Sequence, residues 1–145
     1  MEEGTARTNL LESVRRGYSE EEIHFIYEHI RIALMNGEIK WAKVVLDGLT
    51  ELAPDYVPGW LALSYVSMFD RDFDLAISAS HHAARIDAQS VEAALFLSTC
   101  YMSQGDYQTA GTNLGEAFEL IESQGGNDGF RRLYRLLLER FNRTR

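Results

Sequence analysis

The residues of this sequence that could do chemistry are few, and their spacing does not suit it. His81 and His82 are adjacent, and neighbouring side chains on a helix point about 100° apart, so the pair would chelate a metal ion poorly. Asp70, Asp72 and Asp74 alternate as at the start of a calcium-binding loop, but the glycine and the distal glutamate of such a loop are missing. These patterns predict no metal site.

Cys100 is the single cysteine, and it lies in the apolar stretch LFLSTCYM. A cysteine in such surroundings is predicted to pack as a small core residue rather than to act as a nucleophile. Without a second cysteine no internal disulfide can form, which fits a reducing compartment. The segment GGNDG at 125–129 lacks the lysine and the serine or threonine of a phosphate-binding loop. The sequence therefore predicts a protein that is not an enzyme and uses no cofactor.

Charge is unevenly distributed along the chain. The formal net charge is −8, but residues 128–145 carry six arginines against two acidic residues, so the rest of the chain carries −12. An acidic body argues against nucleic acid as the main partner, and we interpret the arginines as the solvated face of a terminal helix. No apolar run approaches the ~20 residues needed to cross a bilayer, and the N-terminus lacks the apolar core of a secretion signal. We therefore expect a cytoplasmic protein without stable membrane insertion.

The elements that must position any functional residues repeat with a period of 34 residues. Ala42, Ala76 and Ala110 fall in step, and the apolar residues around them recur at intervals of three and four, which predicts helices. Small residues at these positions let the two helices of a hairpin approach closely. The period divides residues 19–124 into three repeats, at 23–56, 57–90 and 91–124, after an extension at 1–18.

The turn inside each repeat carries a second signal. Gly37 and Gly105 occupy the same point of the first and third repeats, where a left-handed backbone costs glycine nothing. The second repeat has Arg71 at that point. We therefore expect its turn to be built differently.

Both ends of the repeat array carry helix signals. Ser19, followed three residues later by Glu22, indicates a capping box at the start of the first helix. Residues 125–145 are predicted to form a loop and a C-terminal helix, capped by Asn127 or Asp128, that covers the apolar side of the last hairpin. The apolar side of this helix comprises Phe130, Leu133, Tyr134, Leu137, Leu138 and Phe141.

Residues 23–124 resemble the tetratricopeptide repeat (TPR). The residues that carry the resemblance are Trp60, Leu63, Tyr101, Gly105-Asp106-Tyr107, Ala110, Ala117 and Pro54, which closes the first repeat. The chain departs from the family pattern at Ala88 and Glu122, where the closing proline is usual, and at His29-Ile30. The resemblance implies an all-α TPR solenoid of three helix-turn-helix repeats with a C-terminal capping helix.

TPR proteins hold a segment of another protein in a concave groove, and the resemblance implies which residues line it here. They are Tyr27, Arg31, Leu34, Leu61, Tyr65, Met68, Phe69, Leu95, Phe96, Thr99 and Met102. A lining so apolar, with adaptable methionines, favours an apolar extended segment or an amphipathic helix as the occupant. Among the positions that would carry a carboxylate clamp for heat-shock chaperones, only Arg31 could serve, so that role is disfavoured.

The second and third repeats, in LALSYVSMFDRDFDLAISAS (61–80) and FLSTCYMSQGDYQTAGTNLGEAFELI (96–121), are similar to the TPR chaperones of bacterial type III secretion. This resemblance implies a cytoplasmic chaperone that keeps a hydrophobic secreted subunit, either a translocator or the needle protein, soluble before export. A co-chaperone as a further partner and a homodimer are left open. The alternative is a general TPR adaptor or scaffold in protein–protein assembly.

Overall fold

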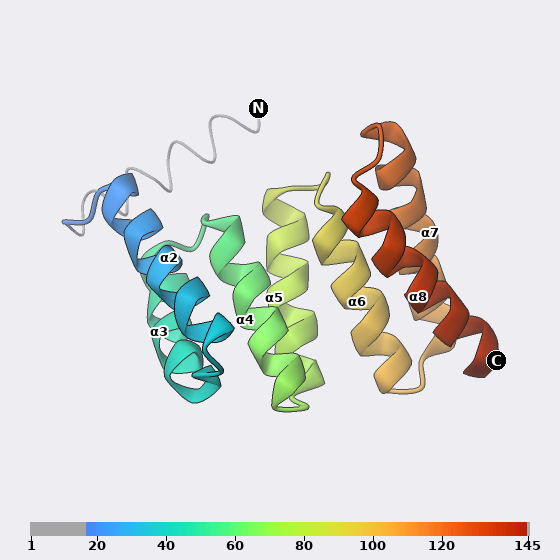
Figure 1. Ribbon diagram of the computed structural model, residues 1–145, viewed down its shortest axis with the longest axis horizontal. Helices are drawn as coiled ribbons and strands as arrows, with labels where there is room; N and C mark the ends of the chain where they lie inside the picture. The colour runs from blue at the N-terminus through green and yellow to red at the C-terminus, as the bar shows by residue number, and fades with distance from the viewer. Residues whose placement is uncertain (1–16, 145) are drawn as a thin grey trace.

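The computed structural model describes residues 17–144, which form seven α-helices arranged side by side in a curved row (Figure 1). The helices are α2 (Glu20–Met35), α3 (Ile39–Leu52), α4 (Val57–Phe69), α5 (Phe73–Ile86), α6 (Val91–Ser103), α7 (Tyr107–Ser123) and α8 (Asp128–Thr144). Of the extension predicted at 1–18, residues 1–16 lie outside the described part. No helix within residues 17–144 is long and apolar enough to cross a membrane.

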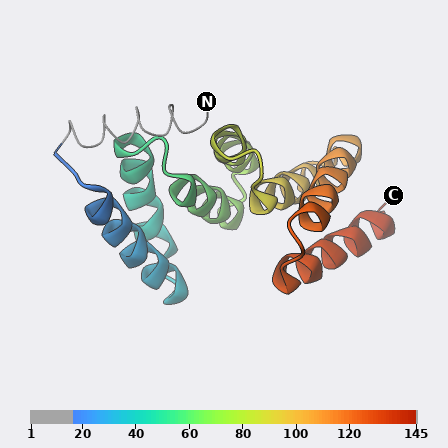
Figure 2. The same ribbon diagram turned by 90° about the horizontal axis from the view of Figure 1, so that it is seen from above.

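The helices pair into three hairpins, α2–α3, α4–α5 and α6–α7, and α8 packs against α6 and α7. Figure 2 shows the row curving, with α2, α4, α6 and α8 toward the inner side and α3, α5 and α7 toward the outer side. The predicted all-α solenoid of three helix-turn-helix repeats with a C-terminal capping helix is confirmed. The repeat boundaries at 23–56, 57–90 and 91–124 stay a prediction.

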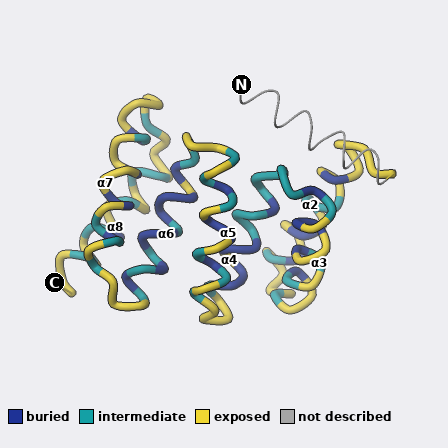
Figure 3. The backbone as a smooth tube through the Cα atoms, turned by 180° about the vertical axis from the view of Figure 1, so that it is seen from behind, coloured by how far each residue is buried: buried dark blue, intermediate teal, exposed yellow. Residues whose placement is uncertain are grey.

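Small side chains let the helices of each hairpin lie close together. Ala42, Ala76 and Ala110 are each fully buried, and in the middle hairpin the Ser64 hydroxyl donates to the carbonyl of Ala76 at 2.9 Å and lies 2.6 Å from the Ser80 hydroxyl. Because these buried hydroxyls are hydrogen-bonded, their burial costs little. Buried positions are densest in α6, with eight, and in α4, with five, and both helices lie in the middle of the stack (Figure 3).

The turns inside the three hairpins share one geometry, which corrects the expectation for the second. Gly37, Arg71 and Gly105 all have left-handed backbones, with φ of 80°, 58° and 82°. Each donates its N–H to the carbonyl three residues back at 3.1 Å, and the next residue donates to the carbonyl five residues back at 2.9 Å. These bonds satisfy the last carbonyls of the first helix. Because these carbonyls must be paired, the turn keeps the same geometry in the second hairpin, where Arg71 adopts the left-handed backbone despite its strain.

Side-chain caps define where helices begin. The Ser19 hydroxyl accepts from the N–H of Glu22 at 3.1 Å, as the capping box predicts. Of the two candidates at the start of α8, Asn127 is the cap, since its side-chain oxygen accepts from the N–H of Gly129 at 2.8 Å. Further along α8, Leu137 joins the core formed by residues of α6 and α7.

Candidate groove on the inner face

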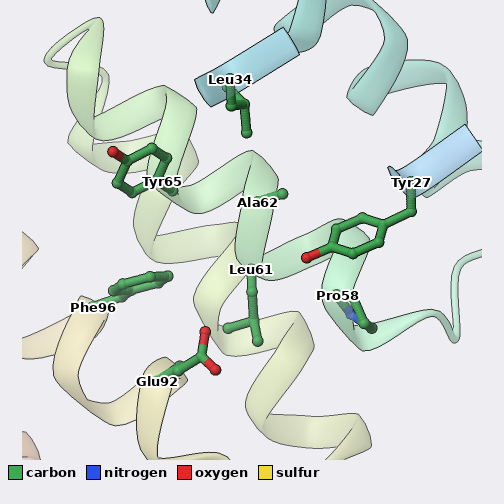
Figure 4. A pocket seen from close by; sticks show the side chains of 8 residues that line it. All are labelled: Tyr27, Leu34, Pro58, Leu61, Ala62, Tyr65, Glu92 and Phe96. Atoms are coloured by element: carbon green, nitrogen blue, oxygen red, sulfur yellow. The ribbon is translucent and has the colours of Figure 1, made fainter. Parts of the chain in front are cut away.

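The first helices of the three hairpins, α2, α4 and α6, enclose a hollow of about 330 Å³ on the inner face (Figure 4). Its lining comprises Tyr27 and Leu34 of α2, Pro58, Leu61, Ala62 and Tyr65 of α4, and Glu92 and Phe96 of α6. These side chains reach the same space because α4 and α6 are in contact and α2, α4 and α6 all lie toward the inner side of the curved row (Figure 2). Apart from Glu92 and the two tyrosine hydroxyls, the lining is apolar.

A second hollow of about 610 Å³ lies between α4, α6 and α8. Its lining comprises Tyr65, Met68, Phe69, Arg71, Phe73, Phe96, Thr99, Leu133 and Leu137. Tyr65 and Phe96 line both hollows, so the two form one continuous depression from α2 to α8, which we call the groove. A concave, largely apolar surface with few polar groups is the usual form of a binding site.

Aromatic side chains dominate the junction of the two hollows. The rings of Tyr65 and Phe69 meet edge to face with centroids 5.1 Å apart. Their exposed fractions are 42% and 59%. Large aromatic side chains left this accessible beside one another normally mark a surface that another molecule covers.

Two polar groups point into the first hollow from opposite walls. Figure 4 shows the hydroxyl of Tyr27 and the carboxylate of Glu92 both turned toward Leu61. Burial raises the pKa of Glu92 above its usual value because the apolar surroundings disfavour the carboxylate. Burial, and then the nearby Glu92, raise the pKa of Tyr27. The hollow therefore offers a hydroxyl and a partly desolvated carboxylate, on a residue that stays exposed to solvent, to a hydrogen-bond donor.

Eight of the eleven side chains that the sequence assigns to the groove line one of the hollows. They are Tyr27, Leu34, Leu61, Tyr65, Met68, Phe69, Phe96 and Thr99. That they bind a partner stays a prediction, but the structure brings them together on one face.

Three assigned residues are placed elsewhere. Leu95 and Met102 are 0% and 3% exposed and belong to the core cluster that includes Leu137. The expectation that they face the groove is therefore wrong, because α8 packs against α6 and closes over this part of it. Arg31 is exposed and lines neither hollow; its guanidinium forms an ion pair with Glu28 at 2.9 Å.

The sequence interpretation missed Arg71, Phe73, Leu133 and Leu137 as groove residues. Leu133 and Leu137 were assigned to the apolar side of the terminal helix, and only the position of α8 shows that this side also walls the groove. Arg71 lies in a turn, where helical periodicity gives no information. Its presence at a point where two repeats have glycine was the available signal.

The residues considered for chemistry take up structural positions. His82 is half-buried and stacks on Trp60 with ring centroids 4.3 Å apart. Burial, and then Arg85 and His81, lower its pKa. Cys100 is fully buried, and burial raises the pKa of its thiol to about 11, which keeps it protonated and unreactive. Residues 17–144 contain no group of three side chains placed to hold a metal ion.

Comparison with known proteins gives structural matches only. No protein-family model matches the sequence, and no curated protein matches it. The structure is similar to the type III secretion translocator chaperone SycD of Yersinia enterocolitica, with a TM-score of 0.79 at 20% identity over 88% of this chain and 86% of SycD. It is also similar to PcrH from Pseudomonas aeruginosa, with a TM-score of 0.79 at 17% identity over 86% of this chain and 95% of PcrH.

A plant protein domain matches nearly as well. The TPR domain of Arabidopsis OM64 has a TM-score of 0.74 at 17% identity, over 85% of this chain and 96% of that domain. At such identities the likeness shows the fold, which is a TPR solenoid resembling these chaperones. SycD has been solved with a peptide of the translocator YopD, and PcrH with the chaperone-binding region of PopD.

Proposed function

We propose that this protein is a non-enzymatic, cytoplasmic chaperone that holds an apolar segment of a secreted type III secretion subunit in its groove before export. The observation that carries the proposal is the continuous apolar depression from α2 to α8, with exposed Tyr65 and Phe69 at its centre. The complexes of SycD and PcrH with translocator peptides favour a translocator as the client. The needle subunit is the alternative client.

The physical role of such a groove is to cover an aggregation-prone segment. An apolar segment free in water tends to associate with other copies, and burial against Tyr65, Phe69 and Phe96 removes that surface from water. The net charge of −8 keeps the complex soluble through repulsion between copies. A co-chaperone and a second copy of the chain are further partners to be tested; SycD itself has been solved in an alternative dimer.

A general adaptor is the second candidate function, and two observations favour it. The OM64 TPR domain matches the structure almost as well as the chaperones do, so the fold does not distinguish the two roles. Arg132 and Arg135 are exposed on α8, whereas Arg131 pairs with Glu122 at 3.0 Å. A folded acidic partner would be recognised there, away from the groove.

The test is recovery of partners from the host with the intact protein, identified by mass spectrometry. We expect a secreted, apolar protein at about one to one, lost in a Tyr65→Glu, Phe96→Glu variant. Val44→Glu is the matched control, since Val44 is 71% exposed on α3 and lines neither hollow. Loss of partners on charge reversal at Arg132 and Arg135, with no effect of the groove variant, would contradict the chaperone and support the adaptor.

A further inference from the structure

The first hairpin, at one end of the row of helices, exposes apolar side chains (Figure 1). Phe25 and Ile32 of α2 are 63% and 52% exposed. They are seven residues apart, so they lie on the same side of the helix. They come two residues before Tyr27 and Leu34, which line the first hollow beside α4, and therefore point about 200° away from it. Both side chains thus face outward, away from the rest of the stack.

Residues of α3 continue this outward surface. They are Val45, Gly48 and Leu52, spaced by three and four residues on one side of the helix. Val45 comes two residues after Lys43, whose ammonium pairs with Asp70 at the end of α4, so Val45 also points away from α4. Val45 and Leu52 are half-buried, and a Cβ at Gly48 would meet nothing within 4 Å. We call the surface made by Phe25, Ile32, Val45, Gly48 and Leu52 the end face.

The opposite end of the stack has a helix over it. Leu114 and Ile121 of α7 are buried in one cluster with Leu137 of α8, and Phe130 and Tyr134 of α8 pack against that cluster. In the described part of the chain the first hairpin has no such cover, since α2 and α3 pack against each other and α3 packs against α4. A helical solenoid needs a cap at each end that turns a polar side to water. The end face is therefore the surface of the stack that lacks its cap.

Acidic side chains lie beside the end face. Glu20, Glu21 and Glu22 form the first turn of α2, and all three are exposed. None of them forms an ion pair with another residue between 17 and 144. Glu21 comes four residues before Phe25 and so lies on the same side of α2. An apolar segment that carries basic residues complements this combination.

Residues 5–16, TARTNLLESVRR, have this chemistry. They lie outside the described part of the chain and lead directly into it at Gly17. The segment carries three arginines against one glutamate. Leu10, Leu11 and Val14 have the spacing of residues that share one side of a helix. The sequence therefore predicts an apolar side with basic residues around it.

The length and the attachment of this segment suit the end face. Twelve helical residues span about 18 Å, and the same length separates Glu20 from Ile32 along α2. Gly17 has a left-handed backbone with φ of 88°, which lets the chain reverse just before α2. Because the link from Gly17 to Ser19 is short, the segment meets its own end face at an effective concentration of about a millimolar or more. A second copy at ordinary protein concentrations competes poorly with that.

We propose that residues 5–16 form a short amphipathic helix that covers the end face of their own chain, antiparallel to α2. Leu10, Leu11 and Val14 lie on the end face, and the arginines lie beside the acidic first turn of α2. The segment thus caps the first hairpin as α8 caps the last. The proposal does not depend on what the groove holds, because the groove lies on the other side of α2.

Photo-crosslinking within the intact purified protein tests the proposal. A benzophenone amino acid in place of Ile32 should crosslink to residues 5–16, in a product that runs at the mass of one chain, 16.5 kDa, on a denaturing gel. The same group in place of Phe118, which is exposed on α7 at the other end, should give no such product. Absence of the crosslink from Ile32 would overturn the proposal. A product of twice the mass would overturn it in favour of a second copy as the occupant.

Variants in the segment separate apolar docking from mere proximity. Leu10→Glu with Val14→Glu should lower the crosslink yield about tenfold, because two apolar side chains leave the contact. Thr5→Glu with Asn9→Glu is the matched control: it has the same spacing and charge on the opposite side of the helix and should change the yield less than about twofold. Equal losses in the two variants would contradict docking through the apolar side.

Hydroxyl-radical labelling, read by mass spectrometry, gives a second measurement on chains without the benzophenone group. Labelling of Phe25 should rise about threefold from the native protein to the Leu10→Glu, Val14→Glu variant, because its ring becomes accessible. Equal labelling of Phe25 in the two proteins would show that the segment does not cover the end face. Binding of a client in the groove should be the same in both proteins.

Discussion

The second and third hairpins have the same spacing along the chain, yet equivalent residues in them do different things. Leu61 and Leu95 share a repeat position, but Leu61 lines the first hollow and Leu95 is fully buried. Arg71 and Gly105 also share a repeat position: both have the left-handed backbone of the turn, but their side chains differ. The difference shows that a repeat position specifies a direction from the helix, while the neighbouring helix decides whether that direction leads to solvent or to core.

The largest expected effect is a difference in stability loss when Leu61 and Leu95, which share a repeat position, are each changed to alanine. Leu95→Ala should lower the free energy of unfolding by about 3 kcal/mol, because it opens a cavity in the cluster that includes Leu137. Leu61→Ala should lower it by only about 1 kcal/mol, because its side chain is half-buried and lines an open hollow. Urea denaturation followed by circular dichroism measures both, and equal losses would refute the placement of α8 over α6.

The turn residues should give a smaller effect of opposite sign. Arg71→Gly should raise the free energy of unfolding by about 1 kcal/mol, because glycine adopts the positive φ without strain. The reciprocal change Gly105→Arg should lower it by a similar amount. A Cβ at Gly105 meets nothing within 4 Å, so the cost comes from the backbone alone. Thermal and urea denaturation of the pair are the measurements; a loss of stability in Arg71→Gly would contradict the account.

The smallest effect concerns Glu92, whose repeat equivalent is Pro58. Its pKa is raised by burial, so the folded protein holds a proton that the unfolded chain releases first. The stability of the protein should therefore fall as pH rises from the unfolded-state pKa of a glutamate through the raised folded value. At neutral pH Glu92→Gln should be more stable than the native protein by a few tenths of a kcal/mol, and the gain should vanish in acid.

Denaturation midpoints at acidic and neutral pH measure this gain. Glu116→Gln is the matched control, since Glu116 on α7 is exposed as Glu92 is but lies outside both hollows. A gain that is equal at both pH values, or equal in the control, would show that burial in the groove does not disfavour the carboxylate.

Much of the fold follows from the sequence because it depends on local rules. The step of 34 residues between Ala42, Ala76 and Ala110 is enough to predict three hairpins, since close helix packing demands a small residue at each crossing. The cap at Ser19 follows equally from residue type. The inner-face residues of α2 and α4 are predictable for the same reason, because helical periodicity states which side of a helix they occupy.

The part of the groove that could not be predicted depends on contacts between elements. The burial of Leu95 and Met102 results from the position of α8, which no pattern within residues 91–124 encodes. The stacking of His82 on Trp60 joins two helices across a hairpin and is invisible to periodicity. The residue type of Arg71 predicts a different turn, whereas the backbone hydrogen bonds override the preference of its side chain.

Site-specific photo-crosslinking in the host tests the central claim most directly. A benzophenone amino acid in place of Phe96, which lines both hollows, should crosslink to a secreted, apolar protein. The same group in place of Val44 on α3 should give no such product. Crosslinks to the client from the position of Phe96, with none from the position of Val44, would place the client in the groove. Crosslinks to the client from Val44 and none from Phe96 would contradict the account.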